Sequence, residues 1–153
     1  MPDPDALRAH AARTLPDYML PQRLAVLDAL HDTNGKLDYV LCRNEGGAGF
    51  MAAAYGKLTG SPGICFVTRG PGATNASIGV HTAMQDSAPM ILFVGQIARS
   101  DRDREAFQEV DYRQMFGGLA KWVAQIDCAE RVPEYMARAF RMATSGRPGP
   151  VDR

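Results

Sequence analysis

GICFVTRGPGATNASIGVHTAMQDSAPMILFVG, residues 63–95, holds two apolar runs that are separated by a glycine-rich turn and a segment of helical length. The runs GICFVT (63–68) and MILFVG (90–95) carry no charge and are short, which is typical of strands buried on both faces. A buried strand, a helix and a second buried strand make a βαβ unit. This stretch therefore predicts a parallel sheet.

The same alternation extends in both directions from this unit. DYVLC (38–42) predicts a strand, RNEGGAGFMAAAYGKLTG (43–60) a helix, KWVAQI (121–126) a strand, and the segment after Pro133 a helix. GRPGPV (146–151) turns toward a last strand of only a residue or two. Two helical patterns, in 3–15 and 21–33, precede the first strand. We expect an α/β fold with a parallel sheet and helices on both faces.

Composition narrows the classes of function. The 153 residues are 46% hydrophobic and have no formal net charge, so we expect one globular domain with no nucleic-acid or membrane partner. The first residues lack an apolar targeting segment, and no run reaches membrane-spanning length, which favours a cytoplasmic protein. Three cysteines and three histidines show no metal-ligand spacing, so we expect buried thiols and no metal site.

Two local features are candidates for chemistry. Glu45 begins a long uncharged helical segment. A carboxylate there is favoured by the helix dipole, with Asn44 as N-cap, but a buried acid also needs a partner, and none is visible locally. TRGPGATN (68–75) follows a strand and opens a helix, where backbone amides can hold a polar or anionic ligand. A tight turn that needs glycine explains it equally well, and the two nucleotide fingerprints GxxxxGK[ST] and GxGxxG are absent.

Taken in order, RNEGGAGFMAAAYGKLTG, residues 63–97, REAFQEVD and GRPGPV resemble the pyrimidine-binding domain of thiamine-diphosphate enzymes, most closely the acetolactate synthase branch. The resemblance covers about residues 24–151. It implies that Glu45 hydrogen-bonds N1′ of the cofactor aminopyrimidine across a subunit interface. It also implies ylid formation, followed by decarboxylation and carboligation of small 2-keto acids.

The resemblance also implies further site residues. Four residues match the turn beside the pyrimidine: Gly70, Pro71, Gly72 and Ala73. Gln108 resembles a glutamine near the cofactor and substrate, with Phe107 beside it in the substrate channel. Lys121 matches a lysine at the channel mouth, although Trp122 occupies a position where many relatives have histidine. Ser87 matches a flavin-contacting position, which makes FAD a candidate second cofactor.

Two departures from the family pattern define the expected domain limits. Residues 1–23 lack the FGxPG turn and form an atypical segment, and residues 24–153 form an incomplete pyrimidine domain without the GDG motif that binds Mg²⁺ and the diphosphate. The partner would then be a second copy or a chain with a diphosphate domain. Three interpretations follow: a truncated fragment that is inactive alone, the pyrimidine subunit of a two-chain 2-keto acid decarboxylase, or a non-catalytic interaction domain.

Overall fold

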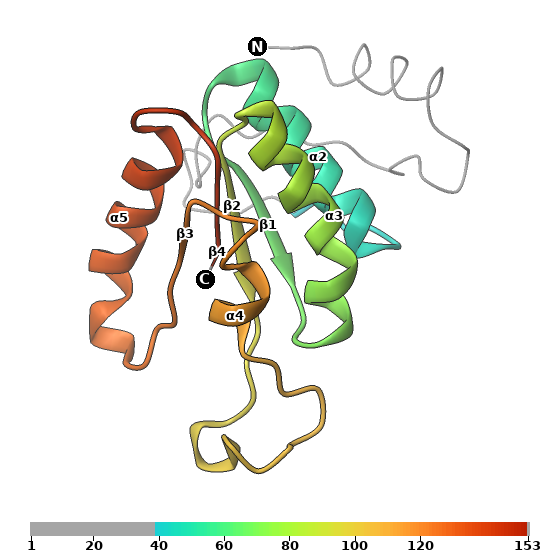
Figure 1. Ribbon diagram of the computed structural model, residues 1–153, viewed down its shortest axis with the longest axis vertical. Helices are drawn as coiled ribbons and strands as arrows, with labels where there is room; N and C mark the ends of the chain where they lie inside the picture. Colours follow the sequence, from blue (N-terminus) through green and yellow to red (C-terminus); the bar gives the residue numbers. More distant parts are fainter. Residues whose placement is uncertain (1–38, 153) are drawn as a thin grey trace.

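A computed structural model describes residues 39–152 and contains a four-stranded parallel sheet (Figure 1). Its strands are β1 (Gly63–Val67), β2 (Met90–Val94), β3 (Trp122–Val123) and β4 (Pro150–Asp152), in the spatial order β1-β2-β4-β3. β1 and β2 pair in register over their whole length, from Gly63 opposite Met90 to Val67 opposite Val94. The predicted parallel sheet is confirmed.

Helices cover both faces of this sheet. On one side, α2 (Glu45–Thr59) and α3 (Pro71–Asp86) lie side by side, and α4 (Tyr112–Phe116) packs into the same core; α5 (Val132–Thr144) covers the other face (Figure 1). Short 3-10 helices occupy Arg99–Asp101 and Ala129–Arg131. Among the described residues, no helix is long and apolar enough to cross a membrane. The predicted α/β class with helices on both faces is confirmed.

The two ends of α2 follow local sequence signals. The Asn44 side chain accepts hydrogen bonds from the N–H groups of Gly46 and Gly47, at 2.8 and 3.4 Å, which satisfies two donors that have no partner inside the helix. At the other end, Gly60 adopts a left-handed conformation with φ 72° and donates its N–H to the Gly56 carbonyl, a common helix stop. The helix is therefore capped without help from Glu45.

The core has one layer on each face of the sheet. The larger layer joins β1 and β2 to the alanines of α2 and α3 and to Phe116 of α4. The smaller one joins Ile91 and Val151 to Ala139 and Ala143 of α5. The cysteines are free thiols; Cys65 is buried, as expected of all three, whereas Cys42 and Cys128 are only half-buried. Burial raises the pKa of Cys65 to about 12, which disfavours the reactive thiolate form.

Two strand predictions need correction. Residues 39–42 do not form a strand, and Tyr39 and Leu41 are 72% and 90% exposed. The apolar pattern of DYVLC suits a buried strand, but a strand also needs a neighbour, and within residues 39–152 only β2 pairs with β1. The strand predicted at 121–126 is limited to Trp122–Val123. The two helical patterns before residue 34 lie outside the described residues.

Candidate functional site

Glu45 lies where the N-termini of α2 and α3 meet. It is the first residue of α2 and is half-buried. Its Oε2 accepts a hydrogen bond of 3.0 Å from Nδ2 of Asn75 on α3. Its Oε1 lies 3.6 Å from the position that a Cβ on Gly72 would take. One carboxylate oxygen is therefore held by α3, and the other faces the glycine-rich turn.

Glycines hold the two helices at backbone contact. A Cβ on Gly79 of α3 would lie 2.5 Å from the carbonyl carbon of Gly49 on α2. A Cβ on Gly56 would lie 2.0 Å from the carbonyl oxygen of Pro89, just before β2. Atoms do not approach this closely, so side chains larger than glycine are excluded at both contacts. The helices have little freedom to slide, and Glu45 is fixed relative to the turn.

The predicted pyrimidine turn forms the start of α3. Gly70 has φ 56° and ψ −107°, a conformation that side chains strongly disfavour. Its N–H donates to the Tyr112 hydroxyl at 2.7 Å. Pro71 begins the helix, where its missing N–H costs nothing, and Gly72 and Ala73 are buried. The turn is therefore fixed by its own backbone and by α4.

Gln108 reaches the same turn from the loop between β2 and α4. A Cβ on Gly70 would lie 2.9 Å from the Gln108 Cβ, so the two backbones pack closely. Gln108 itself has φ 67°, a strained conformation for a residue with a side chain. Phe107 is 81% exposed. An open hollow beside this loop is lined by five residues: Asp103, Glu105, Ala106, Gln108 and Glu109.

The Glu109 carboxylate organises this loop. Its two oxygens accept hydrogen bonds from the N–H groups of Asp103, at 2.7 Å, and Ala106, at 3.1 Å. The bond from Asp103 is the main reason that the pKa of Glu109 is lowered. Two further loop residues, Asp103 and Glu105, have positive φ values of 61° and 54°. The loop is therefore held by hydrogen bonds rather than by a core of its own.

The structure brings some of the predicted residues together and separates others. Glu45 and Gln108 both adjoin the turn at Gly70 and Gly72. Lys121 instead donates to the carbonyls of Met142 and Ser145, at 2.6 and 2.7 Å, where a cation stabilises the end of α5. Burial lowers the pKa of Lys121. Its predicted role at a channel mouth stays a prediction.

Ser87 lies at the opposite end of α3 from the turn. It ends the helix in a left-handed conformation with φ 56°, and its hydroxyl accepts a hydrogen bond of 2.7 Å from Arg147. The 16-residue helix separates it from Pro71 by roughly 24 Å at 1.5 Å per residue. A flavin contact at Ser87 stays a prediction.

Two residues of this site were not singled out by the sequence. Asn75 is the last residue of TRGPGATN, but its contact with Glu45 joins positions 30 apart. Tyr112 is 42 positions from Gly70, and burial is the main reason that its pKa is raised. Neither contact has a local sequence signal, since each depends on how the elements pack.

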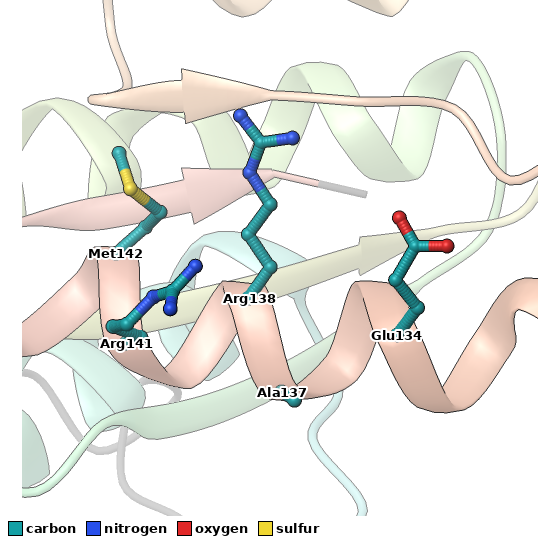
Figure 2. A pocket seen from close by; sticks show the side chains of 5 residues that line it. All are labelled: Glu134, Ala137, Arg138, Arg141 and Met142. Carbon is teal, nitrogen blue, oxygen red and sulfur yellow. The ribbon is translucent and has the colours of Figure 1, made fainter.

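A second hollow lies over α5, on the other face of the sheet, and is lined by Glu134, Ala137, Arg138, Arg141 and Met142 (Figure 2). The Arg138 guanidinium lies 4.6 Å from the centre of the Trp122 ring, a cation–π contact that also covers apolar surface. None of the predicted site residues lines this hollow. The turn at the start of α3 is therefore the better candidate.

In this parallel α/β sheet, a carboxylate and a glycine-rich turn lie beside the carboxyl end of β1. The carboxyl ends of the strands are where domains of this class commonly bind ligands. The chain belongs to the thiamine pyrophosphate enzyme family, because residues 5–115 match its N-terminal TPP binding domain. The resemblance identified from the motifs is thereby confirmed. The chain is a TPP-binding N-terminal domain of the acetolactate synthase-like type.

Several curated relatives are acetolactate synthase subunits by name. The chain is 40% identical over 146 residues to acetolactate synthase isozyme 2 large subunit of Escherichia coli, which covers 95% of this chain and 26% of the relative. It is 42% identical over 128 residues to the mitochondrial acetolactate synthase catalytic subunit of Saccharomyces cerevisiae, covering 84% and 18%. The probable acetolactate synthase large subunit of Methanocaldococcus jannaschii is 38% identical over 146 residues, covering 95% and 24%. The chain thus spans about a quarter or less of these relatives.

Proposed function

We propose that this chain supplies the pyrimidine side of the thiamine-diphosphate site in an acetolactate synthase-like enzyme that acts on small 2-keto acids. The observation that carries the proposal is the carboxylate of Glu45, which is held at Oε2 by Asn75 and faces the turn with Oε1. Among residues 39–152, Oε1 accepts no hydrogen bond. An oxygen that is positioned yet available suits the ring nitrogen of an aminopyrimidine.

The residues around Glu45 fit a flat ring. Gly72 and Gly70 present backbone rather than side chains at the turn, and a Cβ on Gly72 would enter the space beside Oε1. Glu45 would hold and exchange a proton at the ring nitrogen, the turn would contact the ring, and Gln108 would orient the substrate. When bound, thiamine diphosphate supplies the nucleophilic carbon and the electron sink for decarboxylation and carboligation of the 2-keto acid.

The rest of the cofactor would be held elsewhere. We propose that a further domain or a partner chain binds the diphosphate and Mg²⁺, and that a dimer brings this unit to Glu45 in the cytoplasm. The span of the match supports this division, since the relatives are about four times or more as long as the aligned region. Ser87, at the far end of α3, is proposed for a flavin only where FAD is present.

The test is Glu45→Gln in the assembled enzyme. The amide can still hydrogen-bond but cannot exchange a proton, so deuterium exchange at the thiazolium C2 of bound cofactor should fall by about 10²–10⁴-fold. The unfolding midpoint should stay near that of the wild type. Glu130→Gln, a change to an exposed acid in the 3-10 helix Ala129–Arg131, is the control and should leave exchange unchanged. Equal exchange rates in Glu45→Gln and wild type would refute the proposal.

A further inference from the structure

We propose that Asn75 is a positioning residue, whose side-chain amide fixes the Glu45 carboxylate so that Oε1 faces the glycine-rich turn. The inference rests on the proposed role of Glu45 and adds a second residue to it. The observation behind it is the 3.0 Å hydrogen bond from Nδ2 of Asn75 to Oε2 of Glu45. The bond joins the two helices that flank the turn.

Close packing around the bond keeps its geometry fixed. A Cβ on Gly46 would lie 3.2 Å from the backbone carbonyl oxygen of Asn75, so the first turn of α2 lies against the second turn of α3. Farther along, Gly49 and Gly79 bring the same helices to backbone contact. Asn75 therefore projects from a backbone that cannot move away from Glu45, and its short side chain has few rotamers to lose on bonding.

Among the described residues, Asn75 is the residue that orients the Glu45 carboxylate. Two free N–H groups at the start of α2, those of Gly46 and Gly47, are satisfied by Asn44, so the Glu45 carboxylate is not used as their cap. In residues 39–152, Asn75 supplies the hydrogen bond that the carboxylate accepts. Without it, the carboxylate could rotate about its terminal torsion, which has a broad energy profile. A proton-transferring oxygen loses rate when its direction is not held.

The chemistry of an amide suits this position. The Nδ2 group donates without carrying charge, so it orients a carboxylate and does not take part in proton transfer itself. An aspartate there would have nearly the same shape, but it would present an acceptor and a second negative charge to Glu45. An alanine would remove the amide group without adding a charge. The two substitutions separate the loss of orientation from added repulsion.

The first experiment tests the hydrogen bond on the full chain without cofactor. In NMR spectra, the side-chain amide signals of Asn75 should shift on Glu45→Ala, whereas those of Gln85 should not. Gln85 is an exposed amide on the same helix and serves as the internal reference. Unchanged Asn75 signals would show that the bond does not form in solution and would overturn the inference, while leaving the role of Glu45 intact.

The second experiment measures C2 deuterium exchange of thiamine diphosphate with Mg²⁺ in the assembled enzyme. Asn75→Ala should slow exchange by about 3- to 10-fold, the effect of losing one typical hydrogen bond that is accessible to water, and should change cofactor affinity less than twofold. Asn75→Asp should slow it further, and Gln85→Ala should match wild type. Equal rates for Asn75→Ala and Gln85→Ala, with Glu45→Gln still slow, would overturn the positioning role alone. A Glu45→Gln enzyme as fast as wild type would overturn the proposed function instead.

Discussion

The two halves of the candidate site are held in different ways. Glu45 lies on the α2–α3 pair, where glycines bring backbones into direct contact. Gln108 lies on the loop between β2 and α4, which is held by the Glu109 carboxylate and contains three residues with positive φ. Both halves meet at the turn formed by Gly70 and Gly72.

This difference matches what each residue is proposed to do. A group that exchanges a proton must lie within a few tenths of an ångström of its partner, and backbone contacts between helices provide that rigidity. A residue that meets substrate can lie on a loop, because loops adjust to the ligand. Conformational freedom is therefore expected on the Gln108 side of the turn and not on the Glu45 side.

The largest expected effect is on α2, the helix that carries Glu45, where it packs against the chain just before β2. In Gly56→Ala, the added methyl group would lie 2.0 Å from the Pro89 carbonyl oxygen, so α2 must move off β2. The free energy of unfolding should fall by about 3 kcal/mol or more. Chemical denaturation of the full chain measures it.

Gly47→Ala on the same helix is the matched control. A Cβ on Gly47 meets no atom within 4 Å, so this change should leave stability equal or raise it by up to about 1 kcal/mol through helix propensity. If both variants lose the same free energy of unfolding, the loss in Gly56→Ala would come from replacing a glycine in α2 and not from the contact with Pro89. The close contact would then not explain the rigidity.

An intermediate effect is expected where the glycine-rich turn contacts α4. Tyr112→Phe removes the hydroxyl that accepts the Gly70 N–H at 2.7 Å, and it leaves that buried donor without its partner. The free energy of unfolding should fall by about 1–2 kcal/mol.

Tyr39→Phe is the control for this loss, since Tyr39 is 72% exposed and precedes α2. It should unfold at the same denaturant concentration as the wild type. A Tyr112→Phe protein as stable as Tyr39→Phe would mean that water satisfies the Gly70 N–H. The turn would then be independent of α4.

The sequence predicted most of this fold because its signals are local. Strands 63–67 and 90–94 and the helix after Asn44 follow apolar runs, glycine stops and a capping residue, and all three lie where the patterns placed them. DYVLC carries an equally good apolar pattern, but residues 39–42 do not form a strand, because pairing depends on a neighbour that the pattern does not contain.

For the candidate site as well, the sequence predicted the residues that have local signals but not the contacts between distant residues. The motifs singled out Glu45 and the turn, which lie together in the structure. They did not reveal that Asn75 contacts Glu45, or that Lys121 caps α5, because both contacts join residues at least 21 positions apart. Such pairs are set by helix packing, which single-sequence periodicity does not specify.

The smallest expected effect concerns the loop between β2 and α4, which carries Gln108, and its response to pH. Hydrogen bonds from backbone N–H groups, chiefly that of Asp103, lower the pKa of Glu109 from its usual 4.5 in the folded protein. A carboxyl group with a depressed folded-state pKa stabilises the fold above its unfolded-state pKa, and this contribution is lost as pH falls through the folded-state value. The loop should therefore be ordered at neutral pH and loosen below about pH 4.5, while the α2–α3 pair stays intact.

Backbone ¹⁵N relaxation of Asp103 and Ala106, followed from pH 6 to pH 3, measures this change. Both N–H groups donate to Glu109, so their order parameters should fall together in acid, whereas those of Gly49 and Gly79 should stay constant. Glu109→Gln should abolish the pH dependence, because an amide does not titrate in this range, and Glu105→Gln should preserve it. A transition that survives in Glu109→Gln would assign loop order to another group, and simultaneous loosening of Gly49 and Gly79 would show that the two halves are not held independently.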